Sequence, residues 1–264
     1  MAPPFPATTP ADAVAALGTR MEELRPSPSR AAAAARWVGA ALLADSPRLG
    51  SAEFQQLVAD DLWRLFHGYD DRFFGGLLTA ALGPAPRERL RLRTSSRMTS
   101  AGGKALHYRG SSPARFEIAV SSHLLFTNFT PGDAPVQVNG LQCPTRLDAL
   151  QRIFEHELVH LVELLLWGRS SCRRPRFRAL AHALFGHRGV THQLNTPRQR
   201  AWREHRMRAG ERVWFQHQGR RLEGFVNRIT VRATVLVPDP TGRRYTDSRR
   251  YMKFYVPVEA LERR

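Results

Sequence analysis

Hydrophobic residues recur at helical spacing in several stretches of the chain, and these stretches predict helices. Apolar positions over residues 54–66 favour one face of an amphipathic helix, and a second apolar stretch follows at residues 73–78. Residues 146–167 are apolar around much of the helix circumference, so this helix is expected to be buried. A shorter helix is predicted over residues 175–185, with proline in its first turn and Gly186 at its end.

Local residues set the limits of the long helix. Thr145 stands three positions before Asp148, a spacing close to that of a capping box, in which two side chains satisfy N–H groups at the helix start. Gly168 follows the last apolar position and is placed to end the helix. We therefore predict one continuous helix that begins near Arg146.

Alternating apolar and polar residues predict strands in two parts of the sequence. Residues 90–92 and 116–120 alternate in this way, and Gly102-Gly103 is expected to mark a turn between strands. Later in the chain, short runs predict further strands at 213–215, 225–229, 233–237 and 254–256. Four or five strands in about 55 residues favour a small β-barrel. The expected fold is therefore α+β, with a small antiparallel sheet beside the long helix and a barrel after it.

Composition divides the chain into three parts. Residues 1–50 are rich in Ala and Pro and show little apolar periodicity, so a flexible arm is expected there. Residues 51–196 contain the predicted helices and the first strands, and form the expected main domain. Residues 208–264 form the small basic β-barrel.

The chain is strongly basic, with a formal net charge of +17 at pH 7. Residues 196–264 contribute +10 of this charge, from 17 Arg or Lys and 7 Asp or Glu. Basic side chains release condensed counterions when they neutralise phosphates, so this C-terminal region is expected to bind nucleic acid. Among the 40 basic residues only Lys104 and Lys253 are lysines, so a general preference for arginine would account for part of the charge.

Targeting signals and membrane segments are not predicted. The start of the chain has neither the basic residues nor the apolar run of a secretory signal. Arg36 and Glu163 interrupt the two apolar runs that come nearest to the roughly 18 residues a membrane helix needs. We expect a cytoplasmic protein without membrane contact, associated with the nucleoid if it binds DNA. Its cysteines, Cys143 and Cys172, would remain thiols there.

The long helix carries a candidate metal site formed by His156, Glu157 and His160. Two histidines four positions apart lie on one helix face and can reach a single ion, while the glutamate between them can hold a metal-bound water. Burial strengthens this interpretation, because imidazole and carboxylate groups without a partner are costly inside a protein. The alternative is two core histidines satisfied by hydrogen bonds. The pattern favours a zinc hydrolase with Glu157 as the catalytic base.

Zinc needs a third protein ligand, and several residues are candidates. Cys172 lies twelve residues after His160, in the loop between two predicted helices, and a thiolate is a good zinc ligand. An ordinary small apolar loop residue is the alternative interpretation of this cysteine. His182, on the second helix, is the next candidate. His187 and His192 could instead cap the helix, contact substrate or bind phosphate.

Two further residues near the motif are interpreted by their distance from it. Glu163 lies on the face of the motif histidines, one turn further along, where a carboxylate can orient a ligand imidazole. An ion pair with one of the many arginines is the equal alternative for Glu163. Cys143 lies before the helix, about 20 Å from His156 by helical rise, and is expected to be outside the site.

The run over residues 156–168, followed by residues 177–187, resembles the SprT-like zinc metalloprotease family. Residues 69–78 and the first strand pair fit the same family, so the resemblance covers about residues 55–195. It implies a zincin-like fold that binds Zn2+ and hydrolyses peptide bonds. In this family the two motif histidines and a third histidine, just before the next helix, bind zinc, and the motif glutamate is the base.

One ligand position departs from the family pattern. The family's third histidine corresponds here to Cys172 or Arg173, and arginine cannot bind a metal, so Cys172 inherits the role beside His156 and His160. A thiolate puts more negative charge on zinc than an imidazole does. The bound water should therefore be less acidic, and activity weak or tightly gated.

The C-terminal residues 210–215 and 224–229 resemble a KOW- or Tudor-like barrel, a class that binds nucleic acid or peptides. The best understood SprT-like proteins are DNA-dependent proteases that remove proteins crosslinked to DNA. The resemblance implies a zinc-dependent peptide-bond hydrolase acting on nucleic-acid-associated proteins. The alternative is a zinc-containing nucleic-acid-binding protein with little or no hydrolytic activity. The intact Glu157 argues against this alternative, because a structural zinc site has no need of a base.

Overall fold

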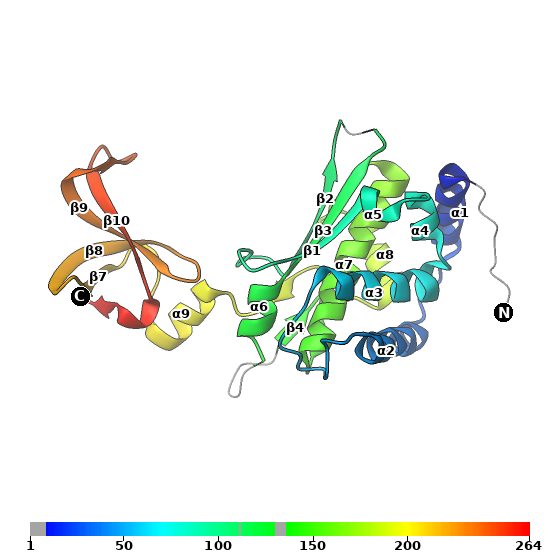
Figure 1. Cartoon of the computed structure of the whole chain (residues 1–264), viewed down its shortest axis with the longest axis horizontal. Coiled ribbons are helices and arrows are strands. Elements are labelled where there is room, and N and C mark those ends of the chain that lie inside the picture. The colour runs from blue at the N-terminus through cyan, green and yellow to red at the C-terminus, as the bar shows by residue number, and fades with distance from the viewer. Residues whose placement is uncertain (1–8, 111, 130–135) are drawn as a thin grey trace. The chain divides into compact units, whose positions relative to one another are not determined.

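The computed structural model describes residues 9–110, 112–129 and 136–264, which form two compact units (Figure 1). The N-terminal unit ends at Leu194 and the C-terminal unit begins at Asn195. Helices and strands occur in both units, and the described strands form three sheets. The predicted α+β class is therefore confirmed.

A three-stranded sheet in the N-terminal unit consists of β1 (Leu90–Ser95), β2 (Gly103–Tyr108) and β3 (Arg115–Ser121), in the order β1-β3-β2. β2 pairs with β3 in antiparallel orientation, but β1 pairs with β3 in parallel. The prediction of an antiparallel sheet was therefore wrong for one of the two pairs. Alternation of apolar residues has the same period in both orientations, so the pattern could not distinguish them. Gly103 begins β2, rather than lying in a turn.

The helix α7 (Arg146–Trp167) has the bounds that its sequence predicts. The backbone N–H of Asp148 donates to Thr145 Oγ1 at 3.2 Å, and the N–H of Thr145 donates to Asp148 Oδ2 at 3.0 Å, which completes the capping box. Gly168 ends the helix in the left-handed conformation, with φ of 63°. The helix contacts β2 and β3 and is buried over most of its length, as its composition predicts.

The remaining elements of this unit surround α7. The first predicted helix begins later than expected, at α3 (Ala59–Tyr69), and continues into a π-helical turn over Asp70–Phe74. The other helices are α4 (Leu77–Leu82), α5 (Pro86–Arg89), α6 (Ser122–Thr127) and α8 (Pro175–Phe185). A small sheet has the order β5-β4-β6, from β4 (Val136–Val138), β5 (Leu141–Cys143) and β6 (His192–Gln193). No helix in the described part of the chain is long and apolar enough to cross a membrane.

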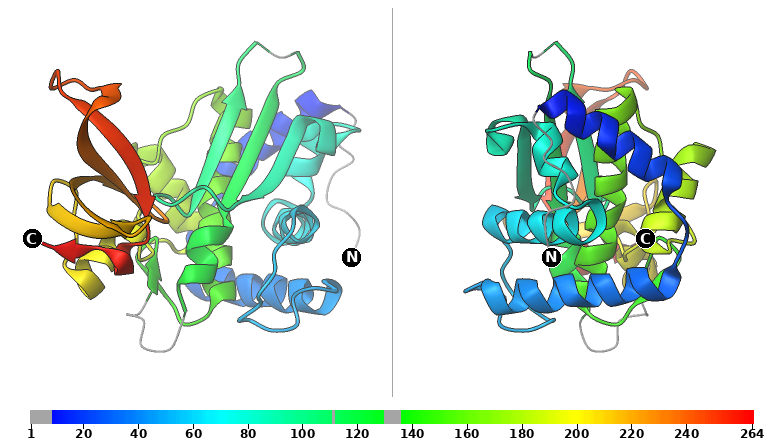
Figure 2. Two further views of the ribbon diagram at one scale, coloured as in Figure 1. Left: turned by 60° about the vertical axis from the view of Figure 1, so that its left-hand side comes forward. Right: turned by 90° about the vertical axis from the view of Figure 1, so that its right-hand side faces the viewer.

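Residues 1–50 were expected to be a flexible arm, but they contribute two helices to the core of the N-terminal unit. These helices are α1 (Pro10–Glu23) and α2 (Pro28–Asp45), and Figure 2 (right) shows both, in blue, lying across α7. The prediction was therefore wrong for residues 10–23 and 28–45. Residues 1–8 lie outside the described residues.

Small residues allow α2 to approach α7 closely, and they explain why the prediction failed. Ala35 and Gly39 are buried on α2, and a Cβ atom added at Gly39 would lie 2.8 Å from the side-chain oxygen of Gln151 on α7. The side-chain amide of Gln151 donates to the carbonyl oxygen of Ala35 at 2.7 Å. A periodicity carried by alanine and glycine is not visible in a search for large apolar side chains.

The C-terminal unit is an antiparallel sheet with a short helix, α9 (Pro197–His205). The strands have the order β10-β9-β8-β7-β11, with bounds β7 (Arg212–His217), β8 (Arg220–Ile229), β9 (Ala233–Arg244), β10 (Arg250–Val256) and β11 (Glu262–Arg263). Within the described residues β10 and β11 are the two edges and do not pair, so the predicted barrel is an open sheet. Alternation predicts strands, but closure depends on twist and on pairing of the end strands.

Candidate metal centre

Three side chains from α7 and the following loop form a group that could hold a metal ion. They are His156, His160 and Cys172, and their ligand atoms all lie within 4.8 Å of one another. The two histidines lie one turn apart on α7, with ring centroids 5.0 Å apart. Gly168 ends the helix and lets the chain turn back, so that the loop returns Cys172 to the histidine face. The structure thus brings together the three residues that the sequence singled out.

The second helix positions the two imidazoles by packing rather than by ligation. Phe177 of α8 is fully buried, and its ring centroid lies 4.8 Å from that of His156 and 4.4 Å from that of His160. His182, the runner-up as third ligand, does not belong to the metal-ligand group found among the described residues. Its Nδ1 atom instead lies 3.2 Å from the carbonyl oxygen of His187.

A hydrogen-bond chain fixes the tautomer of His160. The Ser170 hydroxyl donates to Glu163 Oε2 at 2.6 Å, so the Ser170 oxygen is left to accept from His160 Nδ1, also at 2.6 Å. Nδ1 then carries the proton and Nε2 keeps its lone pair for a metal. Burial lowers the pKa of His160 to about 4, against an opposing effect of Glu163, so the imidazole is neutral at pH 7.

Glu163 both orients an imidazole and forms an ion pair with an arginine, the two roles that its sequence position suggests. Its carboxylate orients His160 through Ser170, and it also accepts a hydrogen bond from Nε of Arg176 at 2.7 Å. The guanidinium of Arg176 stacks on Trp167, 3.8 Å from the ring centroid. The arginine therefore holds a buried carboxylate in place, and the carboxylate, through Ser170, holds the imidazole of the candidate ligand His160 in place.

Glu157 is buried beside this group, with 2% of its surface exposed. Burial raises its pKa to about 8, against the opposing effect of a hydrogen bond from the backbone of Ala105. Strand β2 passes so close that a Cβ atom added at Gly103 would lie 2.5 Å from Glu157 Oε1. Within the described residues no arginine, lysine or histidine forms an ion pair with Glu157. A buried carboxylate without a cationic partner fits a site that receives a metal ion.

The donor set also fits zinc. Two imidazole nitrogens and one thiolate are ligands that zinc prefers, and three protein ligands leave the fourth tetrahedral position for water or substrate, as in catalytic zinc sites. Cys172 is only half-buried, so the centre lies near the surface on that side. The arrangement could bind and activate a water molecule next to Glu157. A cation bound there would lower the pKa of Glu157, so that its carboxyl group loses its proton and can accept one from that water.

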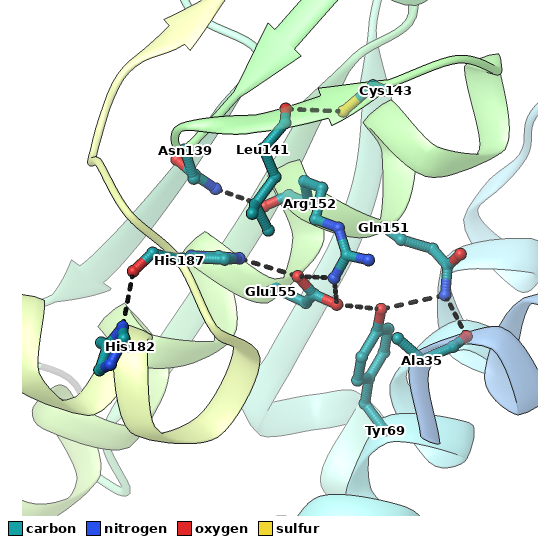
Figure 3. Close-up of polar contacts among 10 residues, drawn as sticks. All are labelled: Ala35, Tyr69, Asn139, Leu141, Cys143, Gln151, Arg152, Glu155, His182 and His187. Carbon is teal, nitrogen blue, oxygen red and sulfur yellow. Dashed lines mark hydrogen bonds and ion pairs between the residues drawn. The ribbon is translucent and has the colours of Figure 1, made fainter. Parts of the chain in front are cut away.

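Sequence reasoning missed a second buried network, on another face of α7 (Figure 3). The Glu155 carboxylate, fully buried, accepts hydrogen bonds from the Tyr69 hydroxyl at 2.7 Å and from Arg152 at 2.7 and 2.8 Å. His187 Nε2 lies 2.8 Å from the other carboxylate oxygen. Burial alone would raise the pKa of Glu155, but Arg152 and His187 outweigh it and the pKa is lowered.

The network joins α7 to distant parts of the chain. Its signal in the sequence is two polar residues four positions apart, Gln151 and Glu155, in a helix that is apolar around much of its circumference. The side-chain amide of Gln151 also donates to the Tyr69 hydroxyl, at 3.1 Å. Cys143 lies near this network in β5, not in the metal-ligand group, and burial raises the pKa of its thiol to about 12. The side chain of His192 lies outside what the structure describes.

No protein-family model, curated protein or solved structure matches this chain. The geometry of the His156, His160 and Cys172 group and the buried carboxyl group of Glu157 are therefore the main indications of function.

Proposed function

We propose that this protein is a zinc-dependent peptide-bond hydrolase of the SprT-like type, with its active centre on α7. The observation that carries the proposal is the pairing of two neighbouring features. The two nitrogen ligands and one sulfur ligand lie within 4.8 Å of one another. The buried carboxylate of Glu157, between the two histidines in the sequence of the same helix, has no ion-pair partner in the described part of the chain. A group used only for structure would not need this carboxylate.

Each residue has a distinct role in the proposed reaction. His156, His160 and Cys172 would hold Zn2+, which supplies a Lewis acid that polarises the scissile carbonyl and makes water more acidic. Glu157 accepts a proton from the attacking water at its carboxylate and passes it to the leaving amine. Gly103 leaves room for that carboxylate under strand β2, because any side chain there would displace it.

The arrangement of elements supports a zincin-like interpretation of the N-terminal unit. The helix with the histidine motif lies against a sheet, with β2 at the sheet edge, and a loop then carries the third ligand towards a second helix. The departure from the SprT-like pattern is the thiolate at Cys172. This ligand should make the centre less reactive than one with three imidazoles.

The basic C-terminal unit supports nucleic-acid-associated proteins as substrates. It carries 17 Arg or Lys and 7 Asp or Glu, and exposes Trp202 and Tyr255 among them. Arginines near an exposed aromatic ring can follow a phosphate backbone while the ring stacks on a base. A protein substrate bound to the same nucleic acid would then be held at high local concentration.

A second candidate function follows from the same basic unit. The protein would bind nucleic acid and use the zinc only to stabilise its fold, with little or no hydrolysis. This candidate explains the charge but leaves the buried carboxylate of Glu157 without a role.

Metal content and turnover together test the proposal. Elemental analysis should find about one zinc per chain in the wild-type protein. The Cys172→Ala protein should lose this zinc, while the His182→Ala protein should keep it, because His182 is outside the ligand group. Wild-type protein free of zinc after preparation in zinc-containing medium would contradict the proposal.

Turnover separates the two candidate functions. The Glu157→Gln protein should keep its zinc and lose hydrolysis of a casein substrate, measured with and without DNA. Glu22→Gln, the same change at an exposed position in α1, is the matched control and should keep full activity. Full activity in Glu157→Gln would remove the proposed mechanism, and absence of hydrolysis in every protein that holds zinc would favour the second candidate.

A further inference from the structure

The loop after α7 forms a pocket of about 300 Å³ beside the candidate metal centre. Its lining residues are Arg169, Ser170, Ser171, Arg174, Pro175 and Arg176. All the charged residues among them are arginines. The sequence around the pocket has the same bias, because residues 164–194 contain six arginines and neither Asp nor Glu. The pocket therefore has a strongly positive potential.

Two of the three arginines are available for a ligand. Arg176 is engaged by Glu163 and by Trp167, so its charge is already paired. Arg169 and Arg174 are exposed, and within the described residues their side chains form no ion pair or hydrogen bond. A guanidinium group presents several N–H donors in a plane and matches a carboxylate or phosphate group.

The pocket and the metal-ligand group share a wall. Ser170 lines the pocket, and its Oγ atom lies 2.6 Å from Nδ1 of His160. Cys172 belongs to the same loop, two positions before Arg174. The same loop therefore contributes to both the pocket and the metal-ligand group, which places the pocket next to the proposed active centre.

We propose that this pocket binds an oxyanion side chain of the polypeptide substrate, a carboxylate or a phosphate, through Arg169 and Arg174. The inference rests on the proposed hydrolase function and adds a substrate class to it: peptides that are acidic or phosphorylated near the scissile bond. A nucleic-acid backbone is a line of phosphates and is followed by an extended basic strip. A single hollow with two free guanidinium groups and the hydroxyl of Ser171 instead suits one compact anionic group.

Equilibrium binding tests the pocket without turnover. The probes are fluorescein-labelled peptides of equal length with four Glu, four phosphoserine or four Gln residues, measured by anisotropy on the full-length Glu157→Gln protein. Adding Arg169→Ala and Arg174→Ala should weaken binding of the Glu and phosphoserine peptides by about tenfold, because two charge-assisted contacts are lost. Relative affinities of the Glu and phosphoserine peptides identify which oxyanion is preferred. Equal affinity with and without the two arginines would overturn the proposal.

Matched variants control for charge and folding. Arg36→Ala with Arg48→Ala removes two other exposed arginines of the N-terminal unit and lowers the net charge equally, so it should leave peptide binding unchanged. Arg169→Lys with Arg174→Lys should retain part of the binding, because the charge stays but the planar donor pattern is lost. Zinc content reports that each variant has folded around its metal-ligand group.

Cleavage of a peptide mixture tests the same pocket during turnover. Wild-type protein should cut preferentially where Asp, Glu or phosphoserine lies within two residues of the scissile bond, as read by mass spectrometry. The Arg169→Ala and Arg174→Ala protein should lose that preference and still cut neutral peptides. Loss of cleavage of neutral peptides to the same extent would mean that the loop is needed only structurally, and would overturn the proposal.

The two measurements distinguish failure of the inference from failure of the proposed function. If neither the wild-type protein nor any variant cuts peptides, but binding of the Glu peptide still requires Arg169 and Arg174, the proposed hydrolase function is wrong. The oxyanion pocket is then supported independently of it. If cleavage shows no preference for acidic peptides, the proposed oxyanion pocket is wrong and the proposed hydrolase function is supported. A labelled 12-nucleotide DNA that loses binding in the double variant, while acidic peptides do not, would overturn the proposal in favour of nucleic acid.

Discussion

Two glutamates of α7, two positions apart, have equal burial and opposite electrostatic environments. Glu155 accepts hydrogen bonds from Arg152 and Tyr69 and lies beside His187, and its pKa is lowered. Glu157 is next to His156 in the helix and has no ion-pair partner among the described residues, and burial raises its pKa to about 8. Because burial is the same, the neighbouring charges account for the difference.

The comparison separates a carboxylate that maintains the fold from one that suits the proposed catalytic role. A buried anion with a full set of partners anchors its helix. Removing the anion leaves those partners buried without the hydrogen bonds and ion pair that it supplied. A buried acid with a raised pKa and no cation nearby is typical of an active site. One face of α7 is thus fixed by Glu155, which holds the other face and Glu157 in position.

The largest effect is expected from removing the charge of Glu155. Glu155→Gln should lower the free energy of unfolding by about 3 kcal/mol or more, because Arg152 is left without its buried partner. Glu157→Gln should change stability by less than about 1 kcal/mol, since it removes no ion pair. Urea denaturation of the two proteins with chelator present measures both. An equal decrease in the free energy of unfolding of the two variants would contradict the difference inferred between Glu155 and Glu157.

The second largest effect is expected from Gly103→Ala, which should lower the turnover rate while zinc stays bound. The added Cβ would lie 2.5 Å from Glu157 Oε1, so the carboxylate or strand β2 must shift. A misplacement of about 1 Å in an active site can lower the turnover rate about 100-fold. Gly50→Ala is the control, since a Cβ there meets no atom within 4 Å. Unchanged turnover in Gly103→Ala with zinc retained would argue against Glu157 as the base.

Ser170→Ala should weaken zinc binding without abolishing it. The serine accepts from Nδ1 of His160 and donates to Glu163, so its loss frees the ligand imidazole to rotate. Loss of such a supporting group lowers metal affinity about 10-fold to 100-fold. Competition with a zinc chelator measures the dissociation constant. Ser171→Ala, one position further along, removes a hydroxyl that takes no part in the hydrogen bonds linking His160, Ser170 and Glu163. It should leave the affinity for zinc unchanged.

The smallest expected effect is a difference in alkylation rate between the two cysteines. Burial raises the pKa of Cys143 to about 12, so it should stay unmodified by iodoacetamide in the folded protein at pH 8. Cys172 is half-buried and should be alkylated in metal-free protein but protected when zinc is added. Peptide mass spectrometry reads both sites. Alkylation of Cys172 at the same rate with and without zinc would remove it from the ligand set.

Parts of the site and fold were predictable because they depend on near neighbours in the sequence. Helical spacing puts His156 and His160 on one face whatever surrounds them. The return of Cys172 was also suggested by Gly168 and the short loop. The Glu155 network was not predictable in the same way, because Tyr69 and His187 lie 86 and 32 positions away from Glu155 in the chain.

The sequence by itself determined the limits of α7, the spacing of its histidines and the positive charge of the C-terminal unit, since each follows from local chemistry or composition. Only the tertiary structure decided that α1 and α2 are buried, that β1 pairs with β3 in parallel, and that the C-terminal sheet stays open. It also decided which buried carboxylate of α7 has cationic partners. The reason is physical: burial, strand orientation and pKa depend on groups that meet only after the chain has folded.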